Sequence, residues 1–192
     1  MRVNEIFHSL QGEGYNTGKS AVFVRLSGCN LQCPFCDTDH DTFHEMSEDQ
    51  IAEEVSQYPA NLVVITGGEP AIQLTETLID KLHAIGKTVA VETNGTQPLP
   101  SNIDWITVSP KEDFVGIRGR VAISRADEVK VIFDGEHPVS DFGIAARHYF
   151  VQPCDTGDET KNGIITKKCV KFVKQNPRWQ LSLQTHKLLN IK

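Results

Sequence analysis

Short apolar runs alternate with amphipathic stretches along the 192 residues of the chain. Apolar runs of this length, bounded by polar or turn-forming residues, predict buried strands. They lie at residues 21–28, 61–68, 88–95, 104–110, 127–133, 148–153 and 179–186. Helices are predicted near 48–58, after a capping box of Ser47 and Gln50, near 75–85, ending at Gly86, and near 161–175. Strand–helix alternation indicates parallel βαβ units.

The chain length limits which α/β fold these units can build. A complete eightfold barrel needs about 250 residues, and this chain has 192. We therefore expect one domain over residues 1–192, folded as an incomplete TIM-like barrel of about six parallel strands. Such sheets bind ligands at the carboxyl ends of their strands. Five predicted strands end there in unusual motifs: the cysteine loop after Gly28, TGGEP, ETNG, SPK and QPCD.

The charge balance and the N-terminal segment narrow the class of protein. The net charge is −6 and no basic face is evident, so we expect no nucleic-acid partner. The first residues lack an apolar signal core, and no run approaches a membrane span. We expect a cytoplasmic protein without a membrane partner. Thiols stay reduced in that compartment, so clustered cysteines there favour metal binding over disulfides.

Three cysteines, Cys29, Cys33 and Cys36, fall within eight residues in a C-x3-C-x2-C pattern. A structural zinc ion takes four protein ligands, and His40 or His44 would have to supply the fourth. Common ferredoxin motifs instead have a first gap of two residues. Three thiolates on a cubane 4Fe-4S cluster would leave one iron open to bind a small molecule. Zinc and an open cluster both remain alternatives at this point.

This spacing resembles that of the radical S-adenosylmethionine superfamily. Phe35 before the last cysteine and the Gly67-Gly68-Glu69 turn, about 30 residues downstream, agree with it. The resemblance implies a 4Fe-4S cluster whose open iron binds S-adenosylmethionine and cleaves it to a 5′-deoxyadenosyl radical. Backbone carbonyls of the glycine turn and the Glu69 side chain are then expected to hold the cofactor's ammonium group. The alternative is an ordinary strand-to-helix turn.

Further segments resemble one family of this superfamily, the 7-carboxy-7-deazaguanine synthases. They are FHSLQGEG (7–14), FVRLSGCN (23–30), CDT (36–38), VSPK (108–111) and LQTHKLLNIK (183–192). The resemblance implies conversion of 6-carboxy-5,6,7,8-tetrahydropterin to 7-carboxy-7-deazaguanine, with loss of ammonia, in queuosine biosynthesis. It also implies Mg2+, a homodimer and an electron donor such as flavodoxin. Some members carry an insertion between the first two cysteines, which this chain lacks.

The resemblance also implies residue roles. Cys29, Cys33 and Cys36 would hold the cluster, and Thr38 would bind Mg2+. The S-adenosylmethionine site would include Phe35, Cys36, Asp37, Gly68, Ser109, Pro110 and Lys111. The substrate site would include Leu10, Gln11, Gly12, Arg25, Thr66 and Lys192. Arg25 would bind the substrate carboxylate, and the terminal carboxylate of Lys192 would contact the donor groups of the pterin. Further candidates for the pocket are Glu13, Glu92, Asn94, Gln152, Gln184 and His186.

Each role has a structural alternative. Arg25 could form a surface ion pair, Thr38 could cap a loop, and residues 109–111 could be only a turn. Cys154 and Cys169 are expected to be core thiols. At the level of function, the rivals are an activase of glycyl-radical enzymes and a zinc-binding or electron-transfer module without catalysis.

Overall fold

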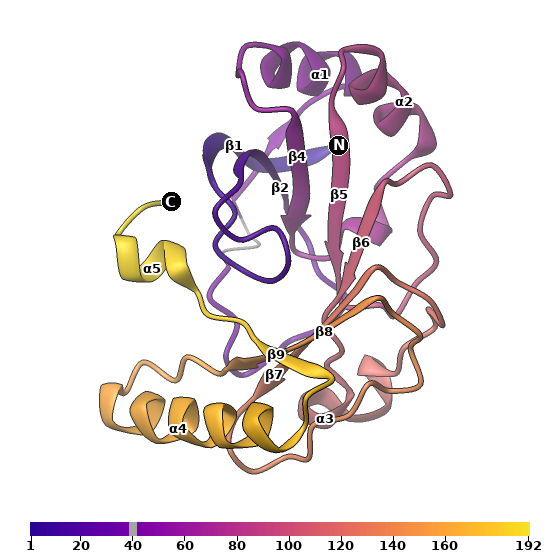
Figure 1. Ribbon diagram of the computed structural model, residues 1–192. Helices are drawn as coiled ribbons and strands as arrows, with labels where there is room; N and C mark the ends of the chain where they lie inside the picture. Colours follow the sequence, from indigo (N-terminus) through magenta and orange to yellow (C-terminus); the bar gives the residue numbers. More distant parts are fainter. Residues whose placement is uncertain (39–41) are drawn as a thin grey trace.

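The computed structural model describes residues 1–38 and 42–192, and these residues form one sheet of nine strands. Its order is β3-β1-β2-β4-β5-β6-β7-β8-β9. Seven neighbouring strands are parallel: β2 (Ser20–Leu26), β4 (Leu62–Gly67), β5 (Thr88–Thr93), β6 (Trp105–Val108), β7 (Glu128–Phe133), β8 (His148–Pro153) and β9 (Trp179–Leu181). The sheet curves without closing, which confirms the incomplete barrel (Figure 1).

Helices cover the outside of the sheet at its two halves. In Figure 1, α1 (Glu48–Ser56) and α2 (Glu76–Ala84) lie beside β4 and β5, and α4 (Glu159–Gln175) lies near β7 to β9. Shorter pieces are α3 (Glu112–Val115), α5 (Thr185–Leu189) and the 3-10 turns η1 (Pro70–Ile72) and η2 (Gly116–Gly119). The three predicted helices are confirmed. The capping box is also present, with Gln50 N donating to Ser47 Oγ at 3.2 Å and Ser47 N to Gln50 Oε1 at 2.8 Å.

The two ends of the sheet differ from the prediction. β1 (Arg2–Leu10) and β3 (His44–Glu45) add two antiparallel strands beside β2, and neither was predicted. The last predicted strand, 179–186, is wrong beyond β9, which ends at Leu181. After β9 the chain leaves the sheet, and Thr185 N donates to Gly12 O at 3.0 Å, so this segment bonds to the loop after β1 instead.

Alternation along each strand separates two outer cores from the barrel interior. Ile65, Val89 and Val91 pack outward against α1 and α2, while Val129 and Val151 pack outward near α4. Inward-facing Phe23, Val64 and Ala90 form a small apolar cluster. Two residues further along the same strands stand Arg25, Thr66 and Glu92, which therefore face the same interior at the carboxyl ends.

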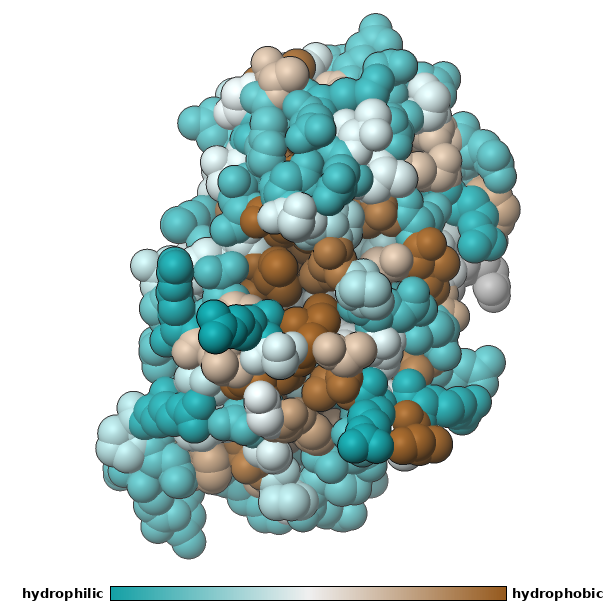
Figure 2. Space-filling view, turned by 90° about the vertical axis from the view of Figure 1, so that its right-hand side faces the viewer, coloured by the Kyte–Doolittle hydropathy of each residue, from teal (hydrophilic) through white to brown (hydrophobic). Residues whose placement is uncertain are grey.

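The outer surface is mixed in character. On the side shown in Figure 2, hydrophilic side chains dominate the upper and lower parts, and apolar side chains gather between them. Within residues 1–38 and 42–192, no helix has both the length and the apolar character needed to cross a membrane.

Candidate active site

A cavity of about 500 Å³ opens at the carboxyl ends of the parallel strands. Every residue predicted for the cluster, cofactor, metal and substrate sites lines it, except Pro110 and Glu69, which are buried outside the cavity lining. The further candidates line it too, as does Cys154; these candidates are Glu13, Glu92, Asn94, Gln152, Gln184 and His186. Cys169 instead lies on the buried face of α4, in the apolar core, as expected.

The cysteine loop forms one side of this cavity. Cys36 N donates to Cys33 O at 3.2 Å, Leu31 N donates to Cys29 Sγ at 3.5 Å, and Cys36 Sγ donates to Thr38 O at 3.9 Å. Burial raises the pKa of the Cys29 and Cys33 thiols, while the positive charge of Lys111 lowers it. The thiols of Cys29 and Cys33 therefore lie near the buried ammonium group of Lys111.

The glycine turn after β4 packs directly against the start of the cysteine loop. A Cβ atom on Gly68 would lie 1.9 Å from Gly28 O, and one on Gly67, whose φ is +114°, would lie 2.2 Å from Leu26 O. Glu69 N donates to Gly28 O at 2.9 Å. Only glycine fits here, because the two loops meet backbone to backbone.

The expectation that the Glu69 side chain holds the cofactor's ammonium group is wrong. Glu69 is 1% exposed and lies outside the cavity lining. Its Oε1 accepts from Thr93 Oγ1 at 2.6 Å and from Ala71 N at 3.0 Å, and its Oε2 accepts from Asn94 N at 2.7 Å. Asn94 Nδ2 in turn donates to Asn30 Oδ1 at 3.0 Å. Glu69 thus braces the turn after β5, and through it the cysteine loop.

Lys111 is folded back onto its own turn. Its Nζ donates to Ser109 O and to Ser109 Oγ, each at 2.7 Å, and burial lowers its pKa to about 8. The turn at 109–111 therefore places a cation and a hydroxyl beside the cysteines.

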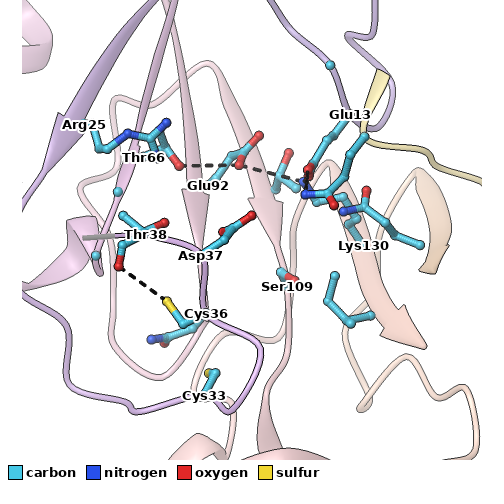
Figure 3. A pocket seen from close by; sticks show the side chains of 18 of the residues that line it. Glu13, Arg25, Cys33, Cys36, Asp37, Thr38, Thr66, Glu92, Ser109 and Lys130 are labelled. Atoms are coloured by element: carbon cyan, nitrogen blue, oxygen red, sulfur yellow. Dashed lines mark hydrogen bonds and ion pairs between the residues drawn. The ribbon is translucent and has the colours of Figure 1, made fainter. Parts of the chain in front are cut away.

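The wall on the inner face of the strands is a connected row of polar side chains (Figure 3). Thr66 Oγ1 donates to Glu92 Oε2 at 3.5 Å, and Lys130 Nζ lies 3.8 Å from the same oxygen. Lys130 Nζ also contacts Glu13 Oε2. At the other end, Arg25 Nε pairs with Glu5 Oε1 at 3.0 Å. Arg25 is thus both an ion-pair partner and a cavity residue.

The C-terminal segment completes the cavity. A Cβ atom on Gly12 would lie 2.2 Å from His186 Nδ1, so His186 packs directly on the loop after β1. Lys187 Nζ bridges Asp37 Oδ2 at 3.0 Å and Asp155 Oδ2 at 2.8 Å. Ser9 Oγ donates to Lys192 O at 2.6 Å. Residues 184–192 therefore connect the cysteine loop, the end of β8 and β1.

Comparison with known proteins agrees with this geometry. The model of the radical SAM superfamily matches residues 23–112. The 7-carboxy-7-deazaguanine synthase of Bacteroides thetaiotaomicron is 50% identical over 100% of this chain and 98% of its own length. The enzyme of the same name from Haemophilus influenzae is 40% identical over 98% of this chain and 92% of its own.

The chain belongs to the 7-carboxy-7-deazaguanine synthase family. The crystal structure of QueE from Escherichia coli superposes with a TM-score of 0.76 at 29% identity, covering 95% of this chain and 93% of that one. As a member of this family the chain is a radical S-adenosylmethionine enzyme, whose cofactors are a 4Fe-4S cluster and S-adenosylmethionine.

The donor set of this family member has the chemistry that a 4Fe-4S cluster takes, since three cysteine thiols line the cavity. Among the described residues, no three His, Cys, Asp or Glu side chains converge closely enough to hold one metal ion. A cubane has no such requirement, because each thiolate binds a different iron. Of the zinc-ligand alternatives, His44 lies exposed on β3 and His40 lies outside the described residues.

Lys130 is a prominent residue of the cavity that the sequence analysis did not predict. It sits in the apolar run 127–133, which predicts a strand and nothing more. Its position is the available signal: Lys130 alternates with Val129 and Val131, so it faces away from the outer core. Glu5 and Asp155, which pair with Arg25 and Lys187, were missed because their partners are distant in sequence.

Proposed function

We propose that this chain converts 6-carboxy-5,6,7,8-tetrahydropterin into 7-carboxy-7-deazaguanine in queuosine biosynthesis, by a redox-neutral radical ring contraction with loss of ammonia. One observation supports this most: the three cysteines and the polar row from Arg25 to Glu13 line the same cavity. A cofactor at the cysteines and a polar heterocycle at the row would therefore meet.

Cys29, Cys33 and Cys36 would hold the 4Fe-4S cluster. Bound together, the cluster and S-adenosylmethionine supply an organic radical able to remove a hydrogen atom from the substrate. Phe35, Cys36, Asp37 and Gly68 would border the S-adenosylmethionine, with Ser109 and Lys111. Pro110 would fix this turn from outside the cavity.

The substrate would lie along the inner wall. Arg25 would bind its carboxylate, because a guanidinium offers parallel donors to carboxylate oxygens. Its Nε already faces Glu5, so the terminal nitrogens would make these bonds. Thr66, Leu10, Gln11 and Gly12 would contact the ring, and the terminal carboxylate of Lys192, which lies beside Ser9, would contact donor groups of the pterin. Reactants held this closely gain large effective molarities.

Thr38 would bind Mg2+. A hydroxyl is a weak ligand, but Mg2+ keeps several waters and often bridges to substrate oxygens. Thr38 lines the cavity directly after Cys36 and Asp37. Arg25 lines the same cavity, so a Mg2+ ion held at Thr38 would add positive charge to the site proposed for the anionic substrate.

Anaerobic reconstitution with iron and sulfide tests the proposal. The protein is supplied with S-adenosylmethionine, a reductant, Mg2+ and 6-carboxy-5,6,7,8-tetrahydropterin, and the product is identified by mass. We expect a product lighter than the substrate by one ammonia, and none from the Cys33→Ala variant. Cleavage of S-adenosylmethionine without this product would favour another radical reaction, such as that of a glycyl-radical activase.

The remaining assignments rest partly on the sequence itself and partly on the family resemblance. We infer one domain, a homodimer, a cytoplasmic location and a small electron-transfer protein such as flavodoxin as reductant. Exposed apolar side chains are available for a subunit contact, among them Ile117 at 71% and Ile164 at 52% exposure. Light scattering of the reconstituted protein tests the dimer directly.

A further inference from the structure

Lys130 is a buried cation on the inner face of β7, placed between two carboxylates. It is 4% exposed, its Nζ contacts Glu13 Oε2, and it lies 3.8 Å from Glu92 Oε2 (Figure 3). Removing an ammonium from water costs several kcal/mol unless it is paired. These two contacts are therefore what allows a lysine at this position.

The same arrangement fixes the two carboxylates at the cavity wall. Gln184 Nε2 donates to Glu13 Oε1 at 3.0 Å, and Gln11 Nε2 donates to Glu92 Oε1 at 2.9 Å. Both glutamates line the cavity. Two neighbouring anions would repel each other without a cation between them. Lys130 thus allows the carboxylates of Glu13 and Glu92, which are hydrogen-bond acceptors, to lie close to each other.

We propose that Lys130 is a positioning residue that keeps Glu13 ionised and beside Glu92, so that the two carboxylates accept the N–H groups of the substrate's aminopyrimidinone ring. This inference rests on the proposed function. The ring carries an amino group next to a ring N–H, and a carboxylate accepts two such parallel donors as it does from a guanidinium. Arg25 stands at the opposite end of the row, so the wall would recognise both ends of the substrate.

The charges around Glu13 determine how a Lys130 variant should behave. Burial raises the pKa of Glu13, but Lys130 outweighs this and brings it down to about 2. The other charged or titratable groups on the packed elements are Glu92 on β5, Glu128 on β7, Lys111 on its turn and His186 on α5. Without Lys130, burial and the neighbouring glutamates would raise the Glu13 pKa.

The test measures affinity for 6-carboxy-5,6,7,8-tetrahydropterin by anaerobic calorimetry on the reconstituted holoenzyme, between about pH 6 and about pH 9. We expect Lys130→Met to weaken binding about 10- to 100-fold near neutrality, as for a lost charged hydrogen bond. Its affinity should recover as pH rises and Glu13 ionises, whereas the parent's affinity stays flat. Lys130→Arg should restore the flat profile.

A buried lysine outside the cavity provides the matched control. Lys87 is 9% exposed and donates to Tyr58 O and Ala60 O, each at 2.8 Å. Lys87→Met should bind the pterin as the parent does at every pH. S-adenosylmethionine affinity, measured in the same samples, should stay within about twofold of the parent in both methionine variants.

The outcomes separate this inference from the proposed function. If the parent binds and converts the pterin but Lys130→Met keeps the parent's affinity and flat profile, the inference is overturned alone. If Lys130→Met weakened pterin binding and S-adenosylmethionine binding equally, Lys130 would only support the fold. That result would also overturn the inference. A parent that does not bind the pterin overturns both.

A second variant covers the case in which Lys130→Met does not fold. The double variant Glu13→Gln with Lys130→Met removes both charges of the pair. It should bind S-adenosylmethionine as the parent does, and the pterin at least about tenfold more weakly, without pH dependence. Parent-like pterin affinity in this variant would overturn the inference.

Discussion

Arg25 shows how a single position joins structure and recognition. It stands on the inner face of β2, where its Nε pairs with Glu5 Oε1 at 3.0 Å and its guanidinium lies 5.8 Å from the centre of the Phe7 ring. Arg25→Ala should weaken pterin binding about 10- to 100-fold, because a charged hydrogen-bonding partner is lost. Reductive cleavage of S-adenosylmethionine should change much less. Arg147, 3.7 Å from Asp127 with a 77% exposed side chain, gives the control Arg147→Ala. If Arg25→Ala reduced pterin binding and S-adenosylmethionine cleavage to the same extent, the role of Arg25 in binding the substrate would be contradicted.

Thr38 makes a different prediction at the same scale. Its carbonyl oxygen accepts from Cys36 Sγ at 3.9 Å, and this backbone contact does not require the side chain. Thr38→Ala should therefore keep the parent's iron content but respond less to added Mg2+. Thr38→Ser, which retains a hydroxyl, should keep the response. Turnover measured against Mg2+ concentration, beside iron analysis, checks this, and an unchanged Mg2+ response in Thr38→Ala would exclude Thr38 as the ligand.

At the scale of elements, Lys187 supplies the ion pairs among the contacts that hold α5 over the cavity. Lys187 Nζ contacts Asp37 Oδ2 and Asp155 Oδ2, while Leu188 on the same helix is 75% exposed. Lys187→Ala should leave the melting temperature close to the parent's but speed amide hydrogen exchange in residues 184–192, because local opening depends on few contacts. Leu188→Ala is the control on the same helix. Exchange as slow as in the parent would mean that the ion pairs do not hold α5.

The elements also show how far the sequence predicts this molecule. The parallel strands and α1, α2 and α4 follow from periodicity, because each buries one regular face. β1 was missed although it spans nine residues, since in its pattern only Val3 is buried. α5 was missed because it buries no residue and is placed by contacts with Gly12, Asp37 and Asp155.

The candidate site also contains residues that local sequence patterns predict and residues that they do not predict. The cysteines, Arg25 and Thr66 sit in motifs, so the sequence predicts them. Glu69 carries a motif but serves the fold, and its contacts to Thr93 and Asn94 come from a neighbouring strand that the motif does not contain. Lys130 has no motif at all. The roles of Glu69 and Lys130 both depend on which strands are neighbours in the sheet. Local sequence patterns do not specify the order of the strands.

At the scale of the whole molecule, the open barrel buries several titratable side chains, among them Glu128 and Lys130. The free energy of unfolding therefore depends on pH. Glu128, at the start of β7, is 2% exposed, and burial raises its pKa from the ordinary value of 4.5 to about 7. Between these values the folded chain binds a proton that the unfolded chain releases. The free energy of unfolding contributed by Glu128 therefore falls as pH rises from 4.5 to about 7, by at most about 3 kcal/mol.

Glu128→Gln isolates this effect, because glutamine stays neutral and its carbonyl can still accept from Tyr15 N, which lies 3.0 Å from Glu128 Oε2. The variant and the parent should have similar unfolding free energies near about pH 4.5, and the variant should become progressively more stable toward about pH 8. Other titrating groups are common to both proteins, so the difference between two denaturant titration series reports Glu128 alone. Glu159→Gln, at an exposed position in the first turn of α4, should show no such trend. A Glu128→Gln difference that stays constant with pH would mean that Glu128 is already ionised in the folded protein, and that Lys130 balances three carboxylates rather than two.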